Sequence, residues 1–434
     1  MKPWRRWAAA WLGAMSAVLG TASAEGQAQD WRALYAPPVA IPFPAANRYS
    51  AAKAALGREL FFDPRLSGNG RQACASCHDP RRAWSDDLAT AVGAAGQRNR
   101  RRTPTLWNLA WAETLFWDGR ADSLESQALQ PIQSATEMDH RLADLIMRLA
   151  AIPAYRQAFA RAFPESPTPN ADHLAAALAT YERTLVSNRT PFDRWLGGED
   201  GALGPSARHG FDLFNGKAHC AVCHAGWNFT DQAFHDIGLP ATADRGRGAT
   251  LALSEADYAF KTPTLREVAR HPPYMHDGSL PTLTAVIRHY NGQFERRPSL
   301  SADLQEIHLD AGEQTDLLAF LEALSAPPSA PPLVKLERRN DTPAITEAVA
   351  TQRVSQRDKA FTPGTIVLKA GALLIVQNDD IRTHNVRIHH PQLDYNSGAQ
   401  KPGMTVTIAF PAPGTYHVFC GIHPRMKLDV TVGD

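Results

Sequence analysis

The sequence lacks the features of a membrane, nucleic-acid-binding or disulfide-rich protein. Its 45 Lys and Arg nearly balance its 44 Asp and Glu, so a basic surface for nucleic acid is not expected. Beyond the N-terminus no apolar run approaches the roughly 18–20 residues of a membrane-spanning helix, so we expect no membrane span. Cysteine is scarce, with five residues in 434, and the placement of those five is the most informative feature of the chain.

The first 24 residues are typical of a secretory signal peptide. Lys2, Arg5 and Arg6 precede an apolar stretch at 7–19, and small residues at 21–24 form a cleavage site. We therefore expect cleavage after Ala24 and export of the mature chain. Removing three positive charges and no acidic residue changes the formal net charge from +1 to −2.

Four of the five cysteines lie in two C-x-x-C-H motifs that begin 146 residues apart. This spacing is that of haem c attachment, in which two thiols bond the porphyrin and the adjacent imidazole ligates the iron. A zinc site is the competing interpretation, but each motif stands alone, without the second ligand pair that tetrahedral zinc requires. We expect two covalently bound haem c groups and no disulfide, with the ligating residues Cys74, Cys77 and His78 in one motif and Cys220, Cys223 and His224 in the other.

The chain divides into a helical part and a β-rich part. Residues 142–163, 172–186 and 316–324 show apolar residues at three- and four-residue spacing, which predicts amphipathic helices. Beyond the proline-rich stretch 326–332, apolar and polar residues alternate, which predicts an antiparallel β-sandwich with a break at 369–371. The predicted fold is multidomain, with two mainly α-helical cytochrome c-type haem domains at 25–200 and 201–325, a linker at 326–335 that separates the domains, and an all-β sandwich at 336–434.

The fifth cysteine belongs to a metal-ligand pattern in the β-rich part. His384 precedes the run Cys420-Gly421-Ile422-His423-Pro424-Arg425-Met426, which lies between two predicted strands. One thiolate, two imidazoles and a distant thioether are the ligands of a type 1 (blue) copper site. A buried structural thiol with incidental histidines is the alternative, but four ligand types in this order favour copper, held by His384, Cys420, His423 and Met426.

Residues 340–434 resemble the cupredoxins, closest in loop spacing to the amicyanin and plastocyanin-like members. The predicted sandwich is therefore a cupredoxin domain. His389 and His390 occupy no motif position and are expected at its surface.

Residues 30–325 resemble the bacterial di-haem cytochrome c peroxidase family, which includes MauG. The resemblance is carried by both haem motifs and by several blocks in family order, namely Pro104–Asn108, Phe116–Ala121, Gln127-Ala128, Glu137-Met138 and Pro273–Gly278. It implies a periplasmic protein with a peroxidatic first haem on His78, an electron-transfer second haem on His224, and Trp117 between them. It also implies that Gln127 and Pro131 line the first haem pocket and that Glu137 moves protons there.

Two departures place the chain near the MauG branch. Many members carry a displaceable His after the first haem motif, but residues 79–137 contain no His and no Met, so we expect an open first iron. The usual methionine ligand of the second haem falls at Tyr290, as it does in MauG. A phenolate favours ferric and higher iron states. Met275 and His289 are the rival ligands.

The family also places a calcium ion between the haems. Backbone carbonyls of His271 and Pro273 fall at its ligand positions, but the Asn ligand falls at Arg102, whose charge would repel calcium. Asn99 could substitute from nearby, so the sequence leaves calcium open.

Three functions follow from these assignments. The first is a peroxidase that reduces hydrogen peroxide to water with electrons delivered through the fused copper domain. A periplasmic small cytochrome c or cupredoxin would supply these electrons. The second is a MauG-like oxidase that draws electrons from a protein or small-molecule substrate. The third is a non-enzymatic electron-transfer protein with three metal centres.

Overall fold

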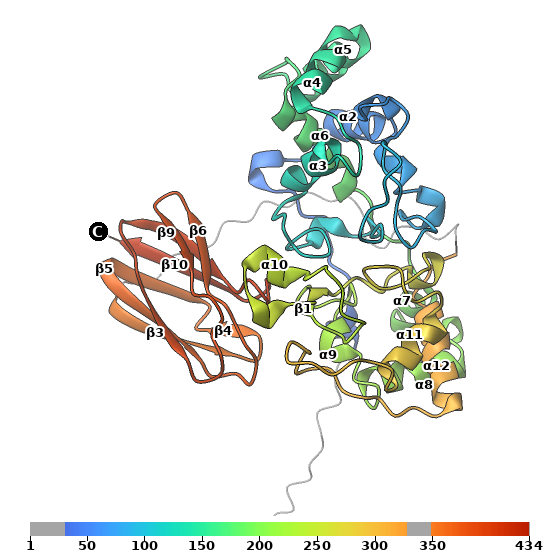
Figure 1. The fold of residues 1–434 in the computed structure, drawn as a ribbon, viewed down its shortest axis with the longest axis vertical. Coiled ribbons are helices and arrows are strands. Elements are labelled where there is room, and N and C mark those ends of the chain that lie inside the picture. The colour runs from blue at the N-terminus through green and yellow to red at the C-terminus, as the bar shows by residue number, and fades with distance from the viewer. Residues whose placement is uncertain (1–30, 328–348, 434) are drawn as a thin grey trace, which may run out of the picture.

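The computed structural model describes residues 31–327 and 349–433. The predicted signal peptide and most of the predicted linker lie outside these residues. The described chain forms two helical regions and a β-sandwich, and the strand β1 and the helix α10 lie between the sandwich and the helical regions (Figure 1). Among the described residues, no helix is both long and apolar enough to cross a membrane.

The first helical region packs α2 against α5 and α6 around an apolar core that includes Leu60, Phe159 and Leu178. The predicted helix over 142–163 is two helices, because Pro153 forces Ile152 into an extended conformation and starts a new helix. The bounds are α2 Ala51–Phe61, α3 Leu124–Gln133, α4 Leu142–Ala151, α5 Pro153–Ala162 and α6 Ala171–Arg183.

The second helical region has an aromatic core in which Phe192, Phe211 and Phe320 pack against one another. Tyr35 of α1 lies in this core and donates a hydrogen bond to the Asn215 side chain, 2.7 Å away, so the start of the described chain packs with the second region. The bounds are α1 Trp31–Tyr35, α7 Pro191–Leu196, α8 Pro205–Asn215, α9 Ala221–His224, α10 Arg247–Leu251, α11 Leu283–Tyr290 and α12 Ala311–Glu322, with the short strands β1 Phe234–His235 and β2 Phe260–Lys261.

Eight strands of the C-terminal part form one hydrogen-bonded sheet around an apolar core. The prediction of a purely antiparallel sandwich is wrong, because β5 pairs in parallel with both β3 and β10; alternation reveals strands but not their direction. The predicted break at 369–371 does not end the strand, since β5 runs through it, but the pairing of β5 with β3 shifts register between Leu368 and Leu373. The bounds are β3 Val349–Arg357, β4 Ala360–Thr362, β5 Thr365–Asn378, β6 Arg387–His390, β7 Leu393–Asn396, β8 Thr405–Ala409, β9 Gly414–Phe419 and β10 Lys427–Gly433.

The sandwich is not a detached body. Leu251 of α10, together with Leu253 and Ala256, belongs to the same apolar cluster as the core of the sandwich. Ala326, the first residue of the predicted linker, is buried, and its backbone N–H faces the Glu267 carboxylate, 3.2 Å away. The sandwich and the second helical region therefore contact each other at this junction, while the predicted linker boundaries stay a prediction.

Candidate functional site: two haem motifs and a copper-ligand loop

Both C-x-x-C-H motifs line one continuous cavity of about 860 Å³ between the helical regions. Cys74 begins a short 3-10 turn, and Cys220 immediately precedes α9, so each motif folds locally around its own two thiols. All four thiols are free of disulfides. An interior void of this size, lined by two attachment motifs, fits two haem groups.

The motif histidines are arranged as iron ligands. The Nδ1 atom of His78 donates to the Trp84 carbonyl at 3.0 Å, and that of His224 donates to the Phe229 carbonyl at 2.8 Å. These hydrogen bonds fix each ring and leave Nε2 for a metal. Burial lowers the pKa of both imidazoles, which keeps them in the neutral form that ligates iron.

The residues predicted around the first haem do line the cavity. Gln127 and Pro131 lie one turn apart on α3, which Ser123 caps by accepting from the Ser126 N–H, and Glu137 follows in the next loop. Burial raises the pKa of Glu137, while Arg120 and a hydrogen bond from Ser134 oppose the shift. A carboxyl group inside a cavity whose pKa is raised by burial is suited to proton transfer.

A second acidic side chain at this end of the cavity escaped the sequence analysis. Glu182 of α6 is 5% exposed, one of its carboxylate oxygens has no hydrogen-bond partner, and burial raises its pKa to about 8. The sequence does contain an indication of this buried carboxyl group, because Glu182 lies four residues after Leu178 and therefore on the apolar face of a predicted helix.

At the second motif the structure separates the three candidate ligands. Tyr290, at the end of α11, and Met275 both line the cavity. The ring of His289 points elsewhere, since its Nε2 donates to the Ile237 carbonyl at 2.8 Å. Burial strongly raises the pKa of Tyr290, so an adjacent cation such as ferric iron would be needed to hold its phenolate.

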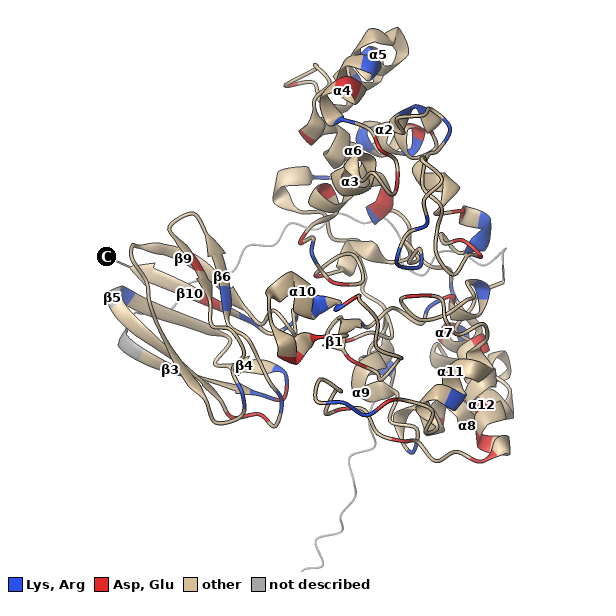
Figure 2. Cartoon of the chain, in the orientation of Figure 1, with Lys and Arg blue, Asp and Glu red and all other residues tan. Residues whose placement is uncertain are grey.

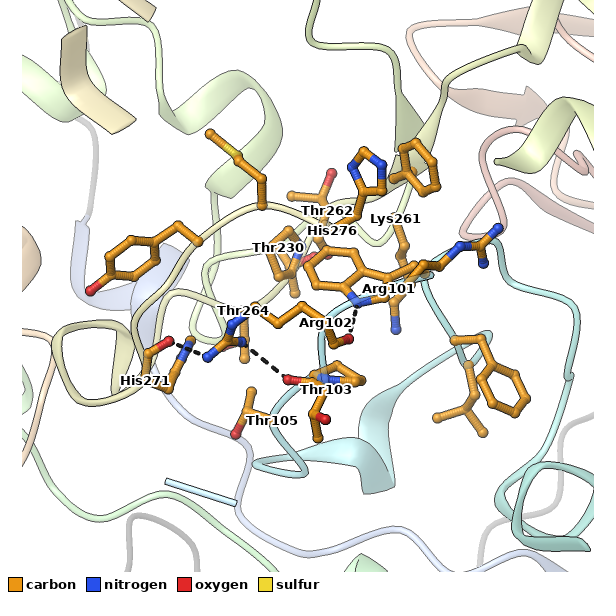
Figure 3. Close-up of a pocket in the computed structure, with 18 of the residues that line it drawn as sticks. Arg101, Arg102, Thr103, Thr105, Thr230, Lys261, Thr262, Thr264, His271 and His276 are labelled. Carbon is orange, nitrogen blue, oxygen red and sulfur yellow. Dashed lines mark hydrogen bonds between the residues drawn. The ribbon is translucent and has the colours of Figure 1, made fainter. Parts of the chain in front are cut away.

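Trp117 lines the same cavity, and its indole N–H donates to the Arg102 carbonyl at 2.9 Å. The Arg102 guanidinium donates to the carbonyls of His271 and Thr103 (Figure 3). It also donates to the Pro272 carbonyl, whereas the sequence placed Pro273 at that position. A guanidinium among these carbonyls does not fit a calcium ion, and Asn99 only lines the cavity nearby.

The copper-ligand residues converge at one end of the sandwich. The loop 420–426 connects β9 to β10, and His384 lies just before β6. The Cys420 sulfur is 3.8 Å from Nδ1 of His384 and 3.6 Å from Nδ1 of His423, and the two Nδ1 atoms are 3.0 Å apart. Met426 is buried in the same core, and its carbonyl accepts from the Cys420 N–H.

Neighbouring groups orient these ligands for a metal. The His384 Nε2–H donates to the buried Asp380 carboxylate at 3.0 Å, which leaves Nδ1 unprotonated toward the cysteine. Backbone N–H groups of Asn385 and His423 donate to the Cys420 sulfur at 3.3 and 3.4 Å. One sulfur and two imidazole nitrogens within 4 Å of one another fit a type 1 copper ion. By contrast, His389 is exposed, as predicted, whereas His390 is partly buried and its ring packs against Tyr416.

This loop, residues 420–426, faces the second haem motif through a histidine that the sequence analysis did not single out. The rings of His423 and His235 have centroids 6.5 Å apart. A ring nitrogen of His235 lies within 4.8 Å of the Cys223 sulfur. His235 is buried and hydrogen-bonds to Asp231 and Ser301. Because 188 residues separate His235 from His423, no local pattern predicts this contact.

Comparison with known proteins agrees with both sites. Residues 51–201 match the di-haem cytochrome c peroxidase family, and residues 333–432 match the cupredoxin-like domain. The methylamine utilization protein MauG of Methylorubrum extorquens is 49% identical over 321 residues, which cover 73% of this chain and 91% of that protein. The chain belongs to the di-haem cytochrome c peroxidase family. It carries a cupredoxin-like domain at its C-terminal end.

Other members of the family are similar over the same region. The cytochrome c551 peroxidase of Pseudomonas aeruginosa is 35% identical over 62% of this chain and 78% of its own length. A crystal structure of a MauG-like protein associated with microbial copper homeostasis superposes with a TM-score of 0.63 at 32% identity, covering 67% of this chain and 94% of that one. The predicted class, helical di-haem region followed by a cupredoxin-like domain, is therefore confirmed.

Proposed function

We propose that the protein is a periplasmic peroxidase that reduces hydrogen peroxide to water and receives electrons through its own copper domain. The observation that carries the proposal is the contact between the copper-ligand loop and the second haem motif through His235. Haem iron, when bound, activates the peroxide bond, and copper, when bound, supplies electrons one at a time.

Several contacts hold the loop 420–426 in this position. The Phe234 N–H donates to the Ile422 carbonyl at 3.2 Å, and Nε of Arg247 donates to the Gly421 carbonyl at 2.8 Å. Arg247 also donates to the carbonyls of Asp118 and Gly119, the residues after Trp117. The loop is thus tied to the second motif and to the segment that carries Trp117.

Charged groups join the two parts around this loop. Lys359, which follows β3, pairs with Asp231 at 3.2 Å and with Asp303 at 3.1 Å. Arg382 pairs with Asp303 as well. Acidic and basic residues occur on both sides of the junction (Figure 2). His423 is only 5% exposed, so this edge of the copper site faces the haem region and not an external partner.

The cavity at the first motif supplies the proton chemistry in this proposal. Reduction of peroxide to water consumes two electrons and two protons. Glu137 lines the cavity, and burial raises its pKa, which favours the protonated form that can donate a proton to the departing oxygen. Gln127 and Pro131 border the same space and restrict what enters it.

A stopped-flow experiment tests the electron route. The fully reduced holoprotein is mixed with peroxide without oxygen, and the blue copper band is followed beside the haem bands. We expect the blue band to return as peroxide is consumed, and to return more slowly in His235→Phe. His389→Ala, an exposed histidine of the sandwich, is the matched control. Copper that stays reduced while the haems turn over would overturn the proposal.

MauG-like oxidation of a protein or small-molecule substrate is the second candidate. The 49% identity to MauG and the position of Tyr290 in the cavity wall favour it. The Cys420→Ser variant separates the two, because loss of copper abolishes a peroxidase that is fed through copper but leaves direct oxidation of a substrate intact. A protein that shows neither activity would be the electron-transfer protein of the third hypothesis.

A further inference from the structure

Arg102 places a fixed positive charge at the contact between the two helical regions. Its side chain is 4% exposed. Nη2 donates to the carbonyls of His271 at 2.5 Å, Pro272 at 3.2 Å and Asp86 at 3.3 Å, and Nη1 donates to the Thr103 carbonyl at 3.1 Å. Four carbonyl oxygens, two from residues 271–272 and one each from Asp86 and Thr103, thus surround one guanidinium. Figure 3 shows the bonds to His271 and Thr103.

Converging carbonyl oxygens are the ligands of a hard cation such as calcium. They carry partial negative charge, and in a buried place they need donors or a positive ion to compensate the loss of water. The guanidinium meets that need with hydrogen bonds and a full charge. A second cation at the same oxygens would meet strong repulsion at this distance in a medium of low dielectric constant.

The backbone of the same residue links the neighbouring elements. The Arg102 N–H donates to the His276 carbonyl at 2.7 Å, and its carbonyl accepts from the Trp117 indole at 2.9 Å. Side chain and backbone together therefore hold the segment 271–276 of the second region and Trp117 of the first.

We propose that Arg102 is a built-in cation that replaces a bound calcium ion between the two haem motifs and positions Trp117 against the segment 271–276. The protein therefore needs no calcium. This inference concerns a metal site and does not depend on which substrate the protein oxidises or on the direction of electron flow.

Metal analysis of the full-length holoprotein tests the first half of the proposal. The protein is dialysed against EGTA, and its calcium content, haem spectra and peroxide-dependent turnover are measured before and after calcium is added back. We expect no stoichiometric calcium and no change in spectra or turnover. One calcium per chain that resists dialysis, or turnover that EGTA removes and calcium restores, would overturn the proposal.

The Arg102→Asn variant tests whether the arginine side chain is what excludes calcium, because it removes the charge and adds an oxygen donor. We expect it to take up about one calcium per chain and to have turnover that falls with EGTA and recovers with calcium. Arg102→Lys, which keeps the charge, should remain free of calcium. Arg71→Asn, the same change at an exposed arginine that does not line the cavity, is the matched control and should behave as wild type. A folded Arg102→Asn variant that binds no calcium and turns over as wild type would contradict the role of Arg102; should it fail to fold, the wild-type calcium measurement still decides.

Discussion

The two haem motifs share a sequence pattern but lie in unlike surroundings. The first faces a polar end of the cavity, where Glu137, Gln127 and the buried Glu182 contribute side chains. The second lies beside the aromatic core that contains Phe211 and Phe320, with Tyr290 in its cavity wall and His235 near both its Cys223 and the copper-ligand loop.

The difference shows that residues remote from the attachment motif set its role. Haem c attachment fixes two thioethers and one imidazole, and these are the same at both motifs. What remains variable is the group on the opposite side of the iron, the nearby acids and the path to other metal centres. An acidic pocket suits proton-coupled reduction, whereas a phenol and an adjacent copper site suit electron exchange.

The largest expected effect concerns the acidic pocket of the first motif. Glu137→Gln should leave both haems bound but slow peroxide turnover by about 10²–10⁴-fold, the usual contribution of a general acid–base group. Steady-state turnover with peroxide checks this. Glu165→Gln, at an exposed position of the same region, is the control and should turn over as wild type. Unchanged turnover in Glu137→Gln would remove the functional contrast between the motifs.

A smaller effect is expected at the second motif. Tyr290→Met should raise the reduction potential of the second haem by an appreciable part of the ~0.8 V range that axial ligands span, because a neutral thioether no longer offsets the positive charge on iron. Spectroelectrochemistry measures the shift. Met275→Leu should leave the potential as in wild type; a large shift in that variant instead would make Met275 the ligand.

The smallest effect is a pH dependence of stability at the first motif. The carboxyl of Glu182 has a folded pKa of about 8 against an ordinary value of 4.5, so between these values the folded protein binds more protons than the unfolded chain. Its stability should therefore fall as the pH rises through that window, by at most ~1.4 kcal/mol per pH unit. Glu182→Gln should flatten this dependence in thermal unfolding of the holoprotein at pH 5.5 and 8, whereas Glu165→Gln should not.

Candidate ligands that are close in sequence also lie close together in the structure, and their assignment to metals stays a prediction. The Cys and His of each haem motif, and the Cys420–Met426 loop, are placed by their own short spacing, which the fold then only has to orient. His384 was found because cupredoxin-like ligand order is specific. The cavity also collects Glu137, Gln127, Pro131 and Trp117, whose assigned roles stay predictions.

Contacts between distant segments were not predictable from the sequence. The Arg102 side chain meets a carbonyl 169 residues away, and His235 meets the copper-ligand loop across the domain junction. These contacts depend on how whole domains pack against each other, and the local spacing of apolar residues in the sequence does not indicate that packing. The same limit applies to the sheet, where alternating residues revealed β5 and β10 but not that they run parallel.

Electron paramagnetic resonance and resonance Raman spectra of the ferric wild-type protein test the central contrast most directly. We expect two distinct haem signals, one five-coordinate high-spin signal from the first motif and one with histidine and tyrosinate ligands from the second. Two six-coordinate signals, or a histidine–methionine signature at the second motif, would contradict it.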